Sequence, residues 1–263
     1  MIQKMKSSLT ISLVQTNNIW ENIEANLSGL SSKIDDIEEQ TDMIILPELF
    51  STGFTMEADK VAESMDGMGV LWMKAISKRK NCLVIGSLLI RESGAFFNRL
   101  IVAFPDGHLE HYDKRHLFSF AGEDKVFKAG KERLVFEYKG FRICPLICYD
   151  LRFPVWARNT DNIDLLIFVA NWPNARMLAW DTLLKARAIE NLCYVIGVNR
   201  VGEDNNKLIY TGHSAVYDAM GGTILSFETG KEAVKSVSID LNHIIQTRGQ
   251  FRFLEDRDDF VIK

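Results

Sequence analysis

The chain contains 263 residues, of which 47% are hydrophobic and 25% are charged, and its formal net charge is −4. These values are typical of a globular protein that builds a large core without disulfides or a structural metal. The mild acidity argues against a protein that coats nucleic acid, because such binding depends on clustered Lys and Arg. No apolar run approaches the roughly 18 residues of a membrane span. We therefore expect a cytoplasmic protein, one domain over residues 1–263, that binds neither nucleic acid nor membranes.

The first half of the chain alternates short apolar runs with longer amphipathic stretches. Four runs predict strands: residues 9–15, 43–47, 82–90 and 97–104. Two intervening stretches predict helices, residues 19–37 and 67–80. In the first of these, apolar residues recur at steps of three and four, as in a helix that lies on a sheet. The predicted order of this half is β, α, β, α, β, β.

The second half repeats this order. Residues 193–197 (CYVIG) correspond to residues 82–86 (CLVIG). Further pairs are residues 165–169 with 43–47, 141–147 with 9–15, the helix 177–192 with 67–80, and the turn 221–222 with 106–107. A duplicated unit of helices and mixed sheet is the simplest explanation. Two such sheets packed face to face predict an α/β fold, a four-layer α-β-β-α sandwich with internal pseudo-twofold duplication.

The four cysteines form no CxxC pair, and no histidine pair is available to complete a zinc site. Cys82, Cys144 and Cys193 lie inside apolar runs and are interpreted as small buried hydrophobic residues. Cys148 differs, because a predicted strand runs into it and a short helix with a proline follows. This strand-to-turn geometry exposes a nucleophile.

Charged side chains follow two other predicted strands, where rigid scaffolds often display catalytic groups. Glu48 directly follows residues 43–47 and has apolar neighbours, although it could also be a structural partner of an arginine. Lys114 lies in a charged segment that, taken alone, is typical of a solvated loop. A Glu, a Lys and a Cys are sufficient for amide cleavage, as base and then acid, oxyanion stabiliser and nucleophile.

A histidine is the more usual base for a cysteine nucleophile. Of the five histidines, only His116 lies in a suggestive position, two residues after Lys114. A Cys-His acyl hydrolase or transferase therefore stays open as an alternative. It predicts that His116→Ala abolishes acylation while Glu48→Gln leaves acylation intact.

The three segments, in this order and spacing, resemble the carbon–nitrogen hydrolases of the nitrilase superfamily, and the similarity covers nearly the whole chain. The resemblance implies the α-β-β-α sandwich. It places the catalytic Glu, Lys and Cys of that superfamily on Glu48, Lys114 and Cys148, and its second Glu on Glu123. The backbone N–H of Tyr149 is then expected to help Lys114 stabilise the oxyanion.

Residues 112–118, 148–154, 170–173 and 186–191 resemble the omega-amidase branch of that superfamily. Members of this branch hydrolyse the terminal amide of 2-oxo acids such as 2-oxoglutaramate and 2-oxosuccinamate and release ammonia. The resemblance implies a Cys thioester, a small amide substrate, no metal or organic cofactor, and a homodimer or larger homo-oligomer. Nitrilase or N-carbamoyl hydrolase activity is one alternative, and a non-catalytic binding protein on the same scaffold is another.

Four further residues are candidates for binding the substrate. Arg152, four residues after the predicted nucleophile, is suited to a carboxylate because guanidinium forms two parallel N–H bonds, although an ion pair with Asp150 is nearly as well supported. Phe118 and Trp172 are candidates for the wall of a small pocket, and Asn171 for a polar contact. Aromatic residues at strand ends are also often part of the core.

Overall fold

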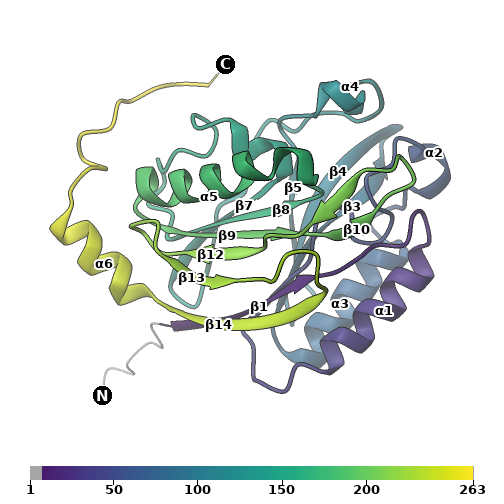
Figure 1. Ribbon diagram of the computed structural model, residues 1–263, viewed down its shortest axis with the longest axis horizontal. Helices are drawn as coiled ribbons and strands as arrows, with labels where there is room; N and C mark the ends of the chain where they lie inside the picture. The colour runs from purple at the N-terminus through teal and green to yellow at the C-terminus, as the bar shows by residue number, and fades with distance from the viewer. Residues whose placement is uncertain (1–7, 263) are drawn as a thin grey trace.

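The structure, a computed structural model, describes residues 8–262. In this part of the chain, twelve strands form two six-stranded sheets (Figure 1). The first sheet has the order β14-β1-β2-β3-β4-β5 and comprises β1 (Ser8–Gln15), β2 (Met43–Ile45), β3 (Leu83–Glu92), β4 (Ala95–Ala103), β5 (Leu109–Asp113) and β14 (Ala233–Asp240). The second has the order β13-β12-β9-β8-β7-β6 and comprises β6 (Phe136–Tyr138), β7 (Phe141–Ile147), β8 (Leu165–Ala170), β9 (Tyr194–Asn199), β12 (Ala215–Tyr217) and β13 (Thr223–Ser226). A separate hairpin pairs β10 (Val201–Glu203) with β11 (Ile209–Thr211).

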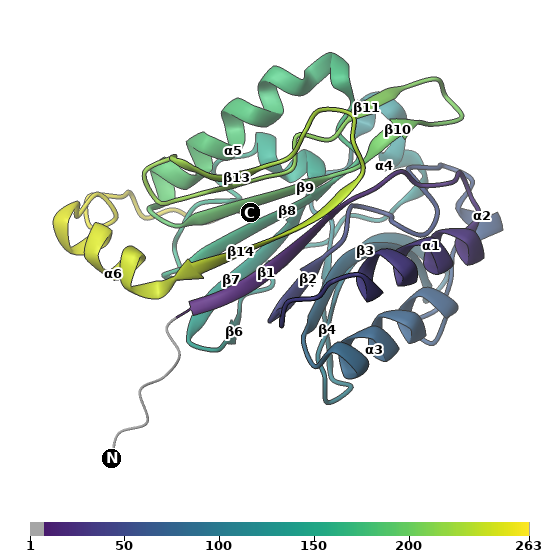
Figure 2. The ribbon, with the colours of Figure 1, turned by 60° about the horizontal axis from the view of Figure 1, so that its bottom comes forward.

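Helices cover the outer faces of the two sheets (Figure 2). Helices α1 (Ile23–Asp35) and α3 (Met68–Lys80) lie on the first sheet, and α5 (Met177–Asn191) lies on the second. The remaining helical segments are α2 (Ala58–Val61), η1 (Ser119–Ala121), α4 (Glu123–Val126), η2 (Cys148–Arg152), η3 (Asn174–Arg176) and α6 (Leu241–Gln250). The predicted four-layer sandwich is thus confirmed. Within residues 8–262, no helix combines the length and the apolar character needed to cross a membrane.

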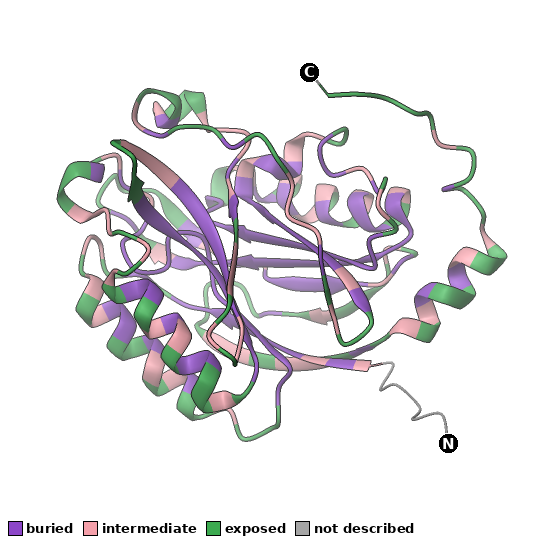
Figure 3. Cartoon of the chain, turned by 180° about the vertical axis from the view of Figure 1, so that it is seen from behind, coloured by how far each residue is buried: buried purple, intermediate pink, exposed green. Residues whose placement is uncertain are grey.

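The side chains of strand β2 show that the first sheet is packed on both faces. Successive side chains of a strand point to opposite faces. Met43 and Ile45 join the apolar cluster between the two sheets, whereas Ile44 joins the cluster beneath α1 and α3. Helix α1 contributes Leu30 and Ile34 to that outer cluster. Figure 3 shows the result: the central strands are buried, and the helices are exposed only on their outward faces.

The two sheets have matching topology, which confirms the predicted duplication. In the first sheet β1, β2 and β3 are parallel, and β4 and β5 continue antiparallel. In the second sheet β7, β8 and β9 are parallel, and β12 and β13 continue antiparallel. Helix α5 precedes β9 as α3 precedes β3. The halves differ after their first strand, where α1 follows β1 but the short η2 follows β7.

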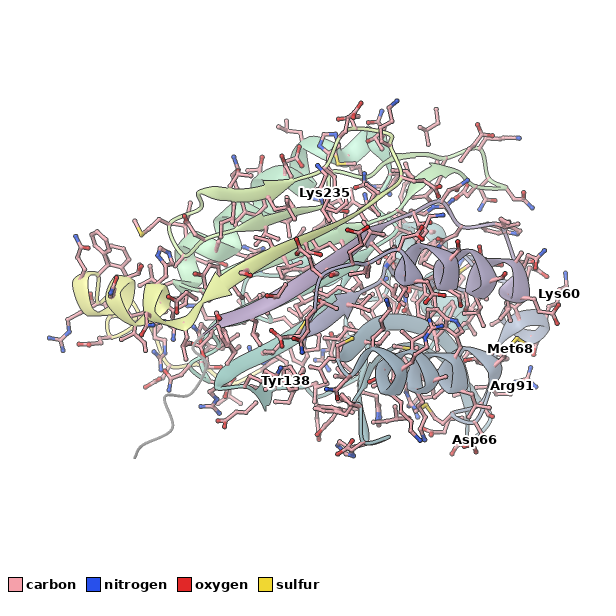
Figure 4. The ribbon with its side chains drawn as sticks, turned by 90° about the horizontal axis from the view of Figure 1, so that it is seen from below. Lys60, Asp66, Met68, Arg91, Tyr138 and Lys235 are labelled. Carbon is pink, nitrogen blue, oxygen red and sulfur yellow. The ribbon has the colours of Figure 1, made fainter. Side chains whose placement is uncertain are left out.

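The last strand ties the two sheets together at one edge. Strand β14 pairs antiparallel with β1 along the whole of β1, from Ser8 opposite Asp240 to Gln15 opposite Ala233. On β14, Lys235 is labelled in Figure 4. Its ammonium donates a hydrogen bond to the Ser226 carbonyl of β13 over 3.0 Å. Strand β14 therefore connects the first sheet to the second.

Candidate active site

The side chains predicted to be catalytic follow strands that come from both sheets. Glu48 lies just after β2 and Lys114 directly after β5, and these two strands run in the same direction in the first sheet. Cys148 directly follows β7 of the second sheet, and Asn171 directly follows β8. The fold thus brings four strand ends together where the two sheets meet.

Cys148 occupies a strained turn. Its φ is +43°, a left-handed conformation that costs a non-glycine residue about 1–3 kcal/mol. Strand β7 ends at Ile147 and η2 begins at Cys148, so the predicted strand-to-turn geometry is present. The N–H of Tyr149 lies in the first turn of η2, where backbone N–H groups lack helical partners. The turn therefore places the thiol and an N–H donor next to each other.

Lys114 is buried between two carboxylates. Its Nζ donates to Glu48 Oε1 over 2.8 Å and to Glu123 Oε1 and Oε2 over 3.0 and 2.9 Å. None of the three side chains is more than 1% exposed. Burial alone would lower the pKa of Lys114, but the charges of Glu123 and Glu48 outweigh it and raise that pKa. The ammonium is therefore charged in the resting site.

Both oxygens of Glu48 have fixed partners. Oε1 accepts from Lys114 and, over 2.8 Å, from Asn98 Nδ2. Oε2 accepts from the backbone N–H of Asn171 over 2.7 Å, and the Asn171 side chain donates to the Glu48 carbonyl over 2.7 Å. The carboxylate is therefore held in one orientation by groups from both sheets.

Asn98 was not singled out from the sequence, although its amide bridges the two carboxylates. Besides Glu48, its Nδ2 donates to Glu123 Oε1 over 3.2 Å. Asn98 is 1% exposed and interrupts the apolar strand β4. A lone amide in such a strand is the one signal that could have identified it.

Glu123 begins α4 and connects the buried Glu48–Lys114 pair to the cavity wall. Its Oε2 accepts the backbone N–H of Phe118 over 2.6 Å in addition to the Lys114 ammonium. Burial and the negative charge of Glu48 raise the pKa of Glu123, while Lys114 opposes this shift. Glu123, the position expected for the second Glu of the superfamily, thus contacts the Lys114 ammonium.

The Cys148 thiol is protonated at rest. Burial raises its pKa well above the ordinary value, and the negative charge of Glu48 adds to the increase, while the Lys114 ammonium opposes it. A hydrogen bond with Glu48 raises the pKa further. A thiol in this state needs a base to become a nucleophile, and Glu48 is the carboxylate with the largest effect on its pKa.

His116 does not pair with the cysteine. Its Nδ1 lies 2.8 Å from Asp150 Oδ1, and its ring stacks on Phe153 with the centroids 3.7 Å apart. In the described part of the chain, no hydrogen bond joins His116 to Cys148. The geometry therefore favours Glu48 over His116 as the base.

A cavity of about 450 Å³ opens above Cys148. Its lining includes Lys114 and every residue predicted to contact the substrate: Phe118, Tyr149, Arg152, Asn171 and Trp172. Sequence reasoning did not identify other parts of the wall, which come from two loops and the β10–β11 hairpin and include Trp20, Phe54, Met56, Leu208 and Tyr210. Among residues 8–262, no group of three or more His, Cys, Asp or Glu side chains is arranged to hold a metal ion.

Two arginines in the cavity wall have no acidic partner within the described range 8–262. The Arg152 guanidinium lies over the Trp172 ring at 4.9 Å, and that of Arg176 lies over the Phe118 ring at 4.9 Å. Among the described residues, neither forms an ion pair, so the alternative pairing of Arg152 with Asp150 is not observed. Cation–π contacts hold both charges in place, and both remain available to an anion.

The chain is similar in sequence and structure to several known proteins. The chain is 42% identical to a Yersinia enterocolitica protein named omega-amidase YafV over 97% of this chain and 99% of that one. It is 31% identical to the Bacillus subtilis 2-oxoglutaramate amidase over 94% and 96% of the two chains. The crystal structure of XC1258 from Xanthomonas campestris, described as a CN-hydrolase superfamily protein with an arsenic adduct in its active site, matches with a TM-score of 0.95 at 44% identity, over 97% of this chain and 99% of that one.

A family model described as carbon-nitrogen hydrolase matches residues 10–249. This range contains all the side chains of the buried cluster and both arginines of the cavity wall. The resemblance expected from the three strand-end segments is thereby confirmed, and the chain belongs to the carbon–nitrogen hydrolase family of the nitrilase superfamily.

Proposed function

We propose that this amidase is an omega-amidase that hydrolyses the terminal amide of small 2-oxo-acid amides, such as 2-oxoglutaramate and 2-oxosuccinamate, to the acid and ammonia. The observation that carries the proposal is the buried Glu48–Lys114–Glu123 cluster, whose Lys114 lines a cavity together with Cys148. Among the described residues, the two guanidiniums of this cavity form no ion pair. Relatives named omega-amidase YafV and 2-oxoglutaramate amidase, at 42% and 31% identity, support this substrate class.

The first step forms a thioester. Glu48 takes the thiol proton of Cys148 as the sulfur attacks the amide carbon. The oxyanion that develops is stabilised by the Lys114 ammonium and the Tyr149 N–H, and one such donor contributes about 3–4 kcal/mol. Glu48 then gives its proton to the amide nitrogen, because an unprotonated amide anion is a very poor leaving group. The C–N bond breaks and ammonia leaves.

The second step regenerates the thiol. Water enters the position vacated by ammonia, and Glu48 takes a proton from it as its oxygen adds to the thioester carbon. The C–S bond breaks, the proton returns to the Cys148 sulfur, and the free acid leaves. Glu123 does not exchange a proton in this scheme; it holds the Lys114 ammonium toward the oxyanion.

The far end of the substrate carries a carboxylate, and we assign it to Arg152. This guanidinium lies in η2, the same short turn as the nucleophile, and has no acidic partner among the described residues. Arg176, on the Phe118 wall, is the second cation of the cavity. A carboxylate bound by such groups forms charge-assisted hydrogen bonds, roughly twice as strong as neutral ones.

The test is a substrate panel scored by ammonia release. It contains 2-oxoglutaramate, 2-oxosuccinamate, the corresponding nitriles and N-carbamoyl amines. Turnover of the oxo-acid amides, with an acyl adduct on Cys148 detected by intact mass, supports the proposal. Inactivity on every oxo-acid amide with turnover of a nitrile or a carbamoyl amine would assign the chain to another branch of the family.

Variants separate the proposed mechanism from the Cys-His alternative. Cys148→Ser and Glu48→Gln are expected to lose acylation, while His116→Ala keeps the adduct on Cys148. Glu63→Gln is a matched control, because this partly buried carboxylate accepts N–H bonds from Gly69 and Val70 at the start of α3, outside the cavity lining. Loss of acylation in His116→Ala alone would favour the alternative.

We also propose that the protein forms a homodimer or larger homo-oligomer, as the resemblance implies. Exposed apolar side chains support association: Phe120 in the cavity wall is 87% exposed, and Val155, three residues after Arg152, is 54% exposed. Light scattering at several protein concentrations tests this, and a monomeric mass throughout would exclude it.

A further inference from the structure

The carboxylate of Asp150 is fully buried and accepts four hydrogen bonds. Its Oδ2 accepts from the Tyr112 hydroxyl over 2.7 Å and from the backbone N–H of Ile147 over 3.0 Å. Its Oδ1 accepts from the backbone N–H of His116 over 3.0 Å and lies 2.8 Å from His116 Nδ1. The exposure of Asp150 is 0%. A buried charge persists only when it is paired and hydrogen-bonded, and each of these donors contributes to that.

In the sequence, Asp150 and its donors flank Lys114 and Cys148, the two residues proposed to act on the substrate. Tyr112 precedes Lys114 by two residues, and His116 follows it by two. Ile147 directly precedes Cys148, and Asp150 itself follows it by two. One carboxylate therefore holds the segment 112–116 and the turn 147–150 against each other.

Each segment is otherwise anchored to its own surroundings. The backbone N–H of Lys114 bonds to the Asn98 carbonyl of the first sheet, and its carbonyl accepts from Gly130. The turn after Cys148 belongs to the second sheet, and Arg187 of α5 donates to the Leu151 carbonyl within it. In residues 8–262, the bonds of Tyr112 and His116 to Asp150 are the hydrogen bonds that join these two segments.

We infer that Asp150 is a positioning residue that sets the separation between the Lys114 ammonium and the Cys148 sulfur. This inference rests on the function proposed above for those two groups. An oxyanion donor must lie within about 2.7–3.1 Å of the developing charge. A displacement of about 1 Å can reduce the rate about 10²-fold. Asp150 never touches the substrate and acts only through the two segments it joins.

The same arrangement gives His116 a role. Its ring is fixed between Asp150 and Phe153, and its neighbour Tyr112 is fixed by donors from Arg115 and Trp156, over 3.1 and 3.0 Å. The histidine that first suggested a catalytic base is therefore a donor that orients the Lys114 segment.

Asp150→Asn tests the inference because it keeps the size of the side chain but replaces one acceptor oxygen by an N–H₂ group that faces donors. We expect kcat for the oxo-acid amide to fall about 10–100-fold, with KM changed less than about threefold, since a lost transition-state contact lowers kcat alone. Alkylation of Cys148 by iodoacetamide is expected to change less than about threefold, because it develops no oxyanion for Lys114.

Asp164→Asn is the matched control. Asp164 is also buried, at 7% exposure, and its carboxylate accepts the N–H of Arg142 and pairs with Arg248 in the second half of the fold. It is outside the cavity lining. The Asp164→Asn substitution is expected to lower the melting temperature, because buried polar networks affect stability wherever they lie. Its kcat should stay within about twofold of the wild-type value.

A graded series covers the case in which Asp150→Asn does not fold. Tyr112→Phe removes one donor, His116→Phe removes the ring donor but keeps the stack on Phe153, and His116→Asn restores an N–H near the position of Nδ1. We expect kcat to be higher in His116→Asn than in His116→Phe, at equal melting temperature.

Two results would overturn the inference. One is a wild-type kcat in Asp150→Asn or in the whole graded series. The other is an equal loss of amide turnover and of Cys148 alkylation, which would indicate general damage to the turn. A wild-type protein inactive on every amide would instead refute the proposed function, so the two failures are distinguishable.

Discussion

The backbone N–H of Asn171 donates to Glu48 Oε2 over 2.7 Å, between residues 123 positions apart and from one sheet to the other. Because Lys114 and Asn98 hold the other oxygen, Glu48 can rotate very little. Its Oε2, which accepts one donor, is thus the oxygen that we propose exchanges a proton with Cys148. The proposed general base is fixed by groups that come together only when both sheets pack.

Replacing Asn98 tests how much this fixation contributes. Asn98→Ala removes the donor shared by Glu48 and Glu123, and we expect kcat to fall about 10–100-fold, since a hydrogen bond to a charged group is worth about 1.5–3 kcal/mol. Asn98→Asp should be worse, because it adds a third carboxylate beside two others. Steady-state kinetics at matched folded fraction gives the result.

Asn159→Ala serves as the control for Asn98. Asn159 is equally buried and hydrogen-bonded, to Ile163 and Asn191, but lies outside the cavity lining. The Asn159→Ala variant should have a lower free energy of unfolding and an unchanged kcat. Equal kinetic effects of the two substitutions would contradict a specific role of Asn98.

The raised pKa of Cys148 predicts the pH dependence of its alkylation. Only the thiolate reacts rapidly, and a pKa well above the ordinary value leaves little thiolate at neutral pH. The alkylation rate should therefore rise about tenfold per pH unit from about pH 7 to pH 9 without a plateau. Peptide mass spectrometry separates Cys148 from the three fully buried cysteines. A rate independent of pH above about 6 would indicate a thiolate–imidazolium pair instead.

Arg152→Met is expected to act on substrate binding. The neutral side chain keeps the length of the stem but loses the charge that we assign to the carboxylate. KM for 2-oxoglutaramate should increase about 10–100-fold, as for loss of a charge-assisted hydrogen bond. Butanamide, which has no carboxylate, should show less than about a threefold change. A similar loss for both substrates would exclude Arg152 as the anchor.

Two glycines at equivalent positions of the duplicated halves should tolerate no side chain. A Cβ at Gly86 of β3 would lie 2.8 Å from Phe50, and one at Gly197 of β9 would lie 2.5 Å from Leu184. Each Gly→Ala change is expected to lower the free energy of unfolding by about 1–3 kcal/mol, as overpacking does. Chemical denaturation measures this. Gly29→Ala in α1, where a Cβ meets nothing within 4 Å, is the control and should not destabilise.

The sequence predicted the central strands because they are short, continuously apolar and covered on both faces. The first helix was predicted over residues 19–37 but spans Ile23–Asp35. Its start is set by Asn22, whose side chain accepts the N–H of Ala25 over 3.1 Å. A capping bond of this kind overrides apolar periodicity, which continues through the preceding turn.

The members of the proposed catalytic cluster were predictable from the sequence, but the hydrogen bonds that connect them were not. Glu48, Lys114 and Cys148 each follow a strand, a pattern visible in the chain. Asn98 escaped notice, and Asp150 was considered only as a partner of Arg152, because Glu48 and Tyr112, to which they bond, lie tens of residues away in sequence. The segment around Lys114 resembled a solvated loop, yet Tyr112 and Asp113 end β5, a strand too short and too polar for its alternation to be distinctive.

The duplication has one consequence for how the enzyme assembles. Glu48 and Lys114 belong to the first copy of the repeated unit and Cys148 to the second, and their partners Asn98 and Asn171 are divided in the same way. Neither copy holds a complete set of reacting groups. A gene cut between β5 and β7 would therefore encode two inert halves, and activity would return only when the fragments recombine.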